Sequence, residues 1–180
     1  MNSGLITVDD VKNGPICYPI LGDESIMSQK EHGTTKKPVL STLLYGCDSK
    51  IADKICSFTR ADAEDKGYAF EKTSWVQDLK ESDQKEVTYY DSVTRKPLFV
   101  APRGRSMEEF LEESKSHGWP SFRDQEVCWE NVRSINEKEA VSVDGTHLGH
   151  NIPDDSGNRY CINLVSIAGY PEGYKLPNKE

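Results

Sequence analysis

The chain has 180 residues, of which 36% are hydrophobic and 29% are charged, and its formal net charge is -8. This length suits one domain with a modest appendage. The negative charge argues against a nucleic-acid partner, because phosphate recognition needs a concentrated positive patch. No stretch approaches the roughly 20 apolar residues of a membrane span. We therefore expect a soluble protein, monomeric, with neither a nucleic acid nor a membrane as its partner.

The first part of the chain predicts little regular structure. Glycine and proline recur through residues 1–42 without a sustained hydrophobic period, which indicates a loosely ordered segment. Asp48 can cap a helix that runs to about Phe58, because apolar residues follow it at helical spacing. Residues 67–79 mix aromatic and charged residues, and their secondary structure is ambiguous. We expect residues 1–80 to form an N-terminal arm with a short helix and no assigned function.

The second part predicts strands around one helix. Residues 86–100 indicate a hairpin, since β-branched and aromatic runs flank a polar turn. Ser106 and Glu109 form a capping box that opens a helix, and Gly118 marks its end. Short strands are expected at residues 127–132, 139–143 and 160–168. The fold class is therefore mainly β, with residues 81–170 as the main domain and 171–180 as a tail.

The five cysteines are Cys17, Cys47, Cys56, Cys128 and Cys161. Their number is odd and no two have C-x-x-C spacing, so an extracellular disulfide framework is not expected. The thiols indicate an intracellular protein, with the cytoplasm as the expected compartment and an organelle as the alternative.

Three short motifs contain the residues that can carry chemistry. They are Gly118-Trp-Pro-Ser-Phe122, His147-Leu-Gly-His150 and Arg159-Tyr-Cys-Ile-Asn163. A strand would place Arg159, Cys161 and Asn163 on one face. Positive charge beside a cysteine stabilises its thiolate, and an imidazole can deliver a proton near neutral pH.

Each motif also has an ordinary structural interpretation. Trp119 could be a core aromatic, and Cys161 an inert buried thiol. The two histidines could be surface residues or half of a metal site. A metal role is the weaker interpretation, because no third ligand at suitable spacing accompanies them.

In this order, the three motifs resemble the B-type methionine sulfoxide reductases, over about residues 87–168. The resemblance implies two antiparallel sheets leaning together as a β-tent, and reduction of methionine R-sulfoxide with Cys161 as the thiol that becomes a sulfenic acid. It implies catalytic roles for Cys161, His147, His150 and Asn163. It implies substrate contacts by Trp119, Phe122, Arg159 and Asp154.

The chain departs from the family pattern in several ways: residues 1 to about 80 match it poorly, the stretch between Phe99 and Gly118 with its capped helix is longer than usual, and two departures concern cysteines. Many members hold a structural zinc with two C-x-x-C pairs, but the corresponding positions here are Asp91, Thr94, Val141 and Asp144. We therefore expect no zinc and no other cofactor. Many members also carry a resolving cysteine where this chain has His117. The candidates for that role are Cys128, Cys56, Cys47 and Cys17, with an arm cysteine slightly favoured. Direct reduction by an external dithiol such as thioredoxin is the alternative.

Two other functions fit the same residues. The first is an assembly subunit that uses the fold without catalysis, and the second is a redox sensor in which oxidation of Cys161 is the signal. Only the enzyme interpretation gives a physical reason for Trp119, both histidines and Cys161 to occur together. It therefore leads, with methionine R-sulfoxide in proteins or in free form as substrate.

Overall fold

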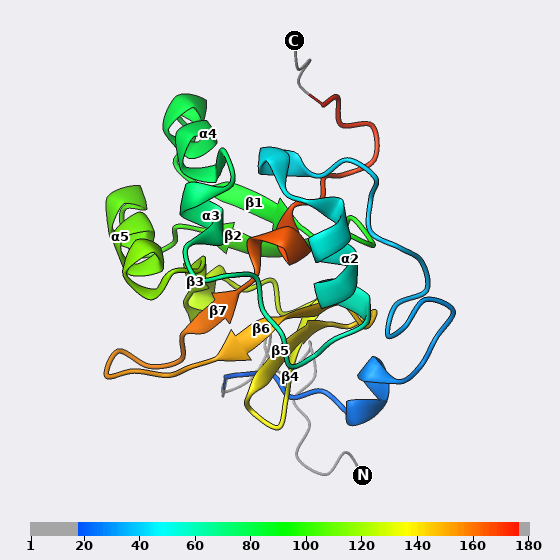
Figure 1. The fold of residues 1–180 in the computed structure, drawn as a ribbon. Helices are drawn as coiled ribbons and strands as arrows, with labels where there is room; N and C mark the ends of the chain where they lie inside the picture. The colour runs from blue at the N-terminus through cyan, green and yellow to red at the C-terminus, as the bar shows by residue number, and fades with distance from the viewer. Residues whose placement is uncertain (1–17, 177–180) are drawn as a thin grey trace.

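The computed structural model describes residues 18–176, and within them the chain forms two antiparallel sheets with short helices around them (Figure 1). The helical elements are η1 (Glu24–Met27), η2 (Leu44–Gly46), α2 (Ser49–Ser57), α3 (Tyr68–Glu71), α4 (Trp75–Ser82), α5 (Met107–His117), η3 (Asp124–Glu126) and η4 (Leu164–Ile167). The strands are β1 (Val87–Tyr90), β2 (Pro97–Ala101), β3 (Ser121–Phe122), β4 (Val132–Ile135), β5 (Glu139–Ser142), β6 (His147–Asn151) and β7 (Tyr160–Ile162). The predicted fold class, mainly β with two antiparallel sheets and short helices, is confirmed.

Local sequence signals place several elements where they were predicted. Asp48 caps α2, because its Oδ1 accepts hydrogen bonds from the next turn's backbone N–H groups at 2.8 and 3.1 Å. Ser106 and Glu109 form the capping box of α5, and Gly118 ends that helix with a φ of 92°. The hairpin predicted at residues 86–100 is the β1–β2 pair.

Two of the predicted strands are wrong in extent. Val127 forms only an isolated antiparallel bridge with Phe99, residues 129–131 form a turn, and β4 begins only at Val132. The strand expected to reach residue 168 ends at Ile162, where η4 follows. There the backbone N–H of Val165 donates to the Glu64 carboxyl at 3.1 Å, and that of Ser166 to the carbonyl of Asn163 at 3.0 Å. These bonds replace a sheet ladder.

The larger sheet has the strand order β3-β7-β6-β5-β4, and the smaller one pairs β1 with β2. Aromatic side chains fill the space between the two sheets. Phe99 of β2 stacks on Phe122 of β3 with ring centroids 4.3 Å apart, and Tyr89 of β1 meets Phe122 edge-on at 5.4 Å. The core therefore ties the sheets together at β3, the edge strand nearest α5.

Residues from the expected N-terminal arm belong to this same core. Ala52, Ile55 and Trp75 are buried together with residues of β2, β6 and η4. In Figure 1, α2 lies against β6 and η4, and the segment that leaves it crosses in front of β6 on its way to α3. The expected boundary at residues 80 and 81 is thus not a boundary between two packed units.

None of the helices in residues 18–176 combines the length and the hydrophobicity that crossing a membrane requires.

Candidate active site

Cys161 lies in a row of polar side chains that crosses four strands. It pairs with Ser121 of β3 on one side and with His150 of β6 on the other, and His150 pairs in turn with Glu139 of β5. Directly opposite residues share one face of a sheet, with Cβ atoms about 5 Å apart. The Oγ of Ser121 is 3.9 Å from the Sγ of Cys161. Cys161 and His150 are both partly exposed, so solvent and a substrate can reach them.

A bulge in β6 brings both imidazoles to this face. Residues three apart in a regular strand point to opposite faces. Here the register with β5 skips Leu148, and the ring centroids of His147 and His150 lie 5.3 Å apart. Only glycine fits at position 149, beside the bulge, because a Cβ atom there would lie 2.0 Å from the carbonyl oxygen of Cys161 and clash with it. The spacing of the two histidines is therefore matched to an irregular strand.

A buried carboxylate orients His147. The Nδ1 of His147 is 2.7 Å from Oε2 of Glu139, and Arg60 donates to the same carboxylate through Nε at 3.0 Å and Nη2 at 2.5 Å. Burial acts to raise the pKa of Glu139, but the hydrogen bonds from His147 and Arg60 outweigh it and the pKa is lowered. A charged carboxylate can only accept, so Nδ1 carries the proton. The Nε2 of His147 is buried and has no hydrogen-bond partner among the described residues.

His150 is the imidazole that stands directly across from the thiol. Burial lowers its pKa from the usual value, and the neighbouring His147 lowers it further. His150 is therefore neutral at pH 7 and able to take up or relay a proton beside Cys161.

A guanidinium contacts the sulfur directly. The Nη1 of Arg159 is 2.6 Å from the Sγ of Cys161, which confirms that these two residues share a face. Arg159 is 5% exposed, and its Nε is 3.8 Å from Oδ2 of Asp154. Asp154 accepts two hydrogen bonds from Arg123, both 2.9 Å, and these lower the pKa of Asp154 to about 2. A positive charge is thus held against the sulfur by a carboxylate that stays ionised.

Helix α5 joins this ion-pair network. Glu113 of α5 bonds to Arg123 and, at 2.8 Å, to Arg105. Ligand atoms of Glu113, His117 and Asp154 lie within 4.8 Å of one another, a spacing that a metal ion could use. Arg123 already pairs with both carboxylates, so we assign the cluster to the ion-pair network and not to a metal.

His117, which stands where the resembling family often has a cysteine, lies at the edge of this network. Burial lowers the pKa of His117, and the charge of Arg159 lowers it further.

Trp119 is anchored through a residue from the segment between α2 and α3. Its indole Nε1 donates to the carbonyl oxygen of Glu64 at 3.0 Å, and its own carbonyl accepts from Ser121 at 3.0 Å. Trp119 remains partly exposed. Ser121 also approaches Cys161. The indole is therefore held only two residues along the chain from Ser121, which faces the thiol.

Two predicted site residues have other roles. Asn163 is 2% exposed, and its amide bonds to the backbone of Glu64 at 2.9 Å and of Leu148 at 3.0 Å. It therefore positions backbone, and its predicted catalytic role stays a prediction. Phe122 is fully buried in the core, because alternation along β3 turns Ser121 toward the site and Phe122 away from it. The predicted substrate contact of Phe122 is wrong.

The candidate resolving cysteines differ in access. Within residues 18–176 no disulfide is present, and Cys47 and Cys56 are buried. Burial raises the pKa of both thiols well above the ordinary value, and raises that of the partly exposed Cys128 to a smaller extent. Cys17 lies outside the described residues. The thiols described in the expected arm are therefore poorly placed to attack a sulfenic acid on Cys161.

Polar contacts join the two loops that would carry zinc ligands in the resembling family. Thr146 donates to the buried Asp91 at 3.1 Å, and Lys96 forms an ion pair with Asp144 at 2.9 Å. No thiol occupies these positions. The expectation of a zinc-free protein stays a prediction.

Sequence reasoning did not find four residues that shape the site: Glu139, Arg60, Glu64 and Arg123. A comparison of the chain with models of known protein families finds no match.

Proposed function

We propose that this protein reduces methionine R-sulfoxide, free or within a polypeptide, with Cys161 as its nucleophile. The observation that carries the proposal is the Arg159 guanidinium 2.6 Å from the Cys161 sulfur, in a row that also contains His150. The substrate and its epimer come from the resemblance of the three ordered motifs to the B-type reductases. The positions of Trp119, His147 and Asp154 around this row support that interpretation.

In the first step, the Cys161 sulfur attacks the sulfoxide sulfur, and the sulfoxide oxygen ends on Cys161 as a sulfenic acid. One proton is needed for each oxygen transferred, and the product is methionine. Arg159 stabilises the thiolate before attack. His150, across the strand from the thiol, relays the proton to the oxygen, and Glu139 keeps His147 oriented beside it.

In the second step, an external dithiol such as thioredoxin reduces the sulfenic acid. One of its thiols attacks Cys161, water leaves and a mixed disulfide forms; its second thiol then releases Cys161 and becomes a disulfide. The burial of Cys47 and Cys56 favours this direct route over an internal resolving cysteine from the expected arm.

The proposal is tested by turnover of a peptide bearing resolved R and S methionine sulfoxide, with dithiothreitol as reductant. We expect loss of the R epimer alone. Cys161→Ser should abolish turnover, whereas Cys128→Ser, which removes another partly exposed thiol, should retain it. No turnover of either epimer by folded protein would refute the proposal and favour an assembly subunit.

A redox sensor is distinguished by the Trp119→Ala variant. In a sulfoxide reductase this change should raise KM for the sulfoxide, because the indole no longer holds the methyl group. Oxidation of Cys161 by peroxide does not need the indole and should proceed at the wild-type rate. If Trp119→Ala left sulfoxide turnover unchanged, the substrate assignment would be wrong.

A further inference from the structure

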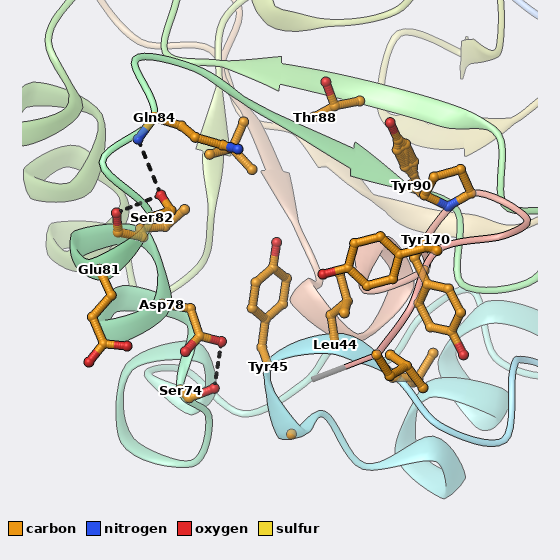
Figure 2. Close-up of a pocket in the computed structure, with 18 of the residues that line it drawn as sticks. Leu44, Tyr45, Ser74, Asp78, Glu81, Ser82, Gln84, Thr88, Tyr90 and Tyr170 are labelled. Carbon is orange, nitrogen blue, oxygen red and sulfur yellow. Dashed lines mark hydrogen bonds between the residues drawn. The ribbon is translucent and has the colours of Figure 1, made fainter. Parts of the chain in front are cut away.

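A groove of about 1040 Å³ lies between β1, η2, α4 and the segment after η4. It shares no lining residue with the row around Cys161, so it is a separate feature of the molecule. Figure 2 shows Thr88 and Tyr90 on one side of it and Leu44 and Tyr45 on the other. Its apolar and aromatic lining includes Leu44, Leu79, Val87, Tyr45, Tyr90 and Tyr170.

One wall of the groove is the free edge of β1. Residues 87, 89 and 91 turn their backbone groups toward β2, as the bond from the N–H of Asp91 to the carbonyl of Lys96 shows. Alternation turns those of Thr88 and Tyr90 to the other edge. On that edge Tyr90 is already hydrogen-bonded, since its carbonyl accepts from the N–H of Gly169 at 2.9 Å. The backbone N–H and C=O of Thr88 have no partner on this edge within residues 18–176.

The rim of the groove is acidic. Asp78, Glu81 and Glu86 line it, and no lysine or arginine does so among the described residues. Glu86 has an exposed ion pair with Arg103 at 3.4 Å, but no basic side chain of residues 18–176 pairs with Asp78 or Glu81. Aromatic rings and carboxylates together favour a cationic guest, because each attracts positive charge.

We propose that this groove binds an extended polypeptide segment bearing lysine or arginine, which adds to the free edge of β1 as a further strand. Its backbone would bond to Thr88, continuing the pairing that Gly169 begins at Tyr90. Alternate side chains would enter the groove, where the aliphatic stems of basic residues lie along tyrosine rings and their charges reach Asp78 and Glu81. A second copy of this chain is a poor occupant, because its net charge of -8 opposes the acidic rim. The inference does not depend on the proposed function.

The test is titration of a fluorescein-labelled peptide of four lysine–valine repeats by fluorescence polarisation, at low salt. Thr88→Pro removes the outward N–H but no donor of the β1–β2 ladder, so it should weaken binding about tenfold. Thr88→Val keeps the N–H and should bind as the wild type does. The double variant Asp78→Asn with Glu81→Gln should also weaken binding about tenfold, and less so as salt rises.

Controls separate the groove from general attraction to an acidic protein. The double variant Glu31→Gln with Glu137→Gln removes two exposed carboxylates elsewhere and should leave the affinity unchanged. A peptide with glutamate in place of lysine should not bind. The proposal is overturned if Thr88→Pro binds as tightly as Thr88→Val, or if removing the distant carboxylates weakens binding as much as removing the two at the rim.

Amide hydrogen exchange on the wild type keeps the test independent of whether Thr88→Pro folds. Without peptide, the Thr88 amide should exchange faster than that of Tyr89, which is paired with β2. With saturating peptide, exchange at Thr88 should slow at least to the Tyr89 rate. If the protein were saturated with peptide and exchange of the Thr88 amide did not slow, the peptide would not add to β1.

Discussion

Replacing Glu64 by glutamine should raise the free energy of unfolding relative to wild type progressively as the pH increases from 5 to 8. Glu64 is 3% exposed, and burial raises the pKa of its carboxyl from 4.5 to about 8. One of its oxygens accepts from the backbone N–H of Val165 at 3.1 Å, while the other is buried without a hydrogen-bond partner among the described residues. The folded protein therefore keeps Glu64 neutral at pH 7, whereas the unfolded chain ionises it.

The size of the effect follows from the two pKa values. A folded pKa above the unfolded one contributes stability that is present below the unfolded pKa and is lost as pH rises through the folded pKa. Between about pH 4.5 and pH 8 the free energy of unfolding falls by ~1.4 kcal/mol per pH unit, on the order of 4 kcal/mol in total. Glutamine resembles the protonated carboxyl and does not ionise, so Glu64→Gln should escape this loss.

The assay is urea unfolding followed by tryptophan fluorescence at pH 5, 6, 7 and 8, in reducing buffer. An amide in place of the unpartnered oxygen can cost about 1–3 kcal/mol, but that cost is the same at each pH. The informative quantity is therefore how the difference in free energy of unfolding between variant and wild type changes from pH 5 to pH 8. Glu137→Gln, which removes an exposed carboxyl, is the matched control and should follow the wild type. Parallel pH dependence of Glu64→Gln and wild type would refute the reasoning.

Three further predictions concern the proposed enzyme. Glu139→Gln should lower kcat/KM for the R-sulfoxide about 10- to 100-fold, since a charged hydrogen bond of about 1.5–3 kcal/mol to His147 is lost. An unchanged kcat/KM would show that Glu139 has no role in catalysis. Single serine replacements of the other cysteines should leave dithiol-driven turnover unchanged if reduction of Cys161 is direct, and a variant that slows it would identify the resolving thiol: Cys17, Cys47, Cys56 or Cys128. Elemental analysis should find no stoichiometric zinc, because the four ligand positions hold no thiol, and one full equivalent would contradict this.

Signals that act over a few residues predicted the structure well. The cap at Asp48, the capping box at Ser106 and the alternating hairpin at residues 86–100 each depend on neighbouring residues alone. The shared face of Arg159 and Cys161 followed from the period of a strand. These features were predictable because the interactions that produce them are local.

Features set by the register between strands were not predictable in this way. The bulge that skips Leu148 decides which face His147 occupies, and it arises only when β6 pairs with β5. The partners Glu139 and His147 are eight residues apart on separate strands. The backbone contacts of Asn163 were not predictable for the same reason, since η4 begins where the strand period was assumed to continue.

The contacts of Arg60 and Glu64 tie part of the expected arm, within the described residues 18–80, to the candidate site. Both residues lie on the segment that follows α2, and Arg60 holds the carboxylate that orients His147, while Glu64 holds the indole of Trp119. The segment is itself fixed because α2 and α4 bury Ile55 and Trp75 in the core that the strands share. Packing of the N-terminal helices therefore determines the geometry around Cys161. Any function assigned to the thiol depends on that packing as much as on the three motifs.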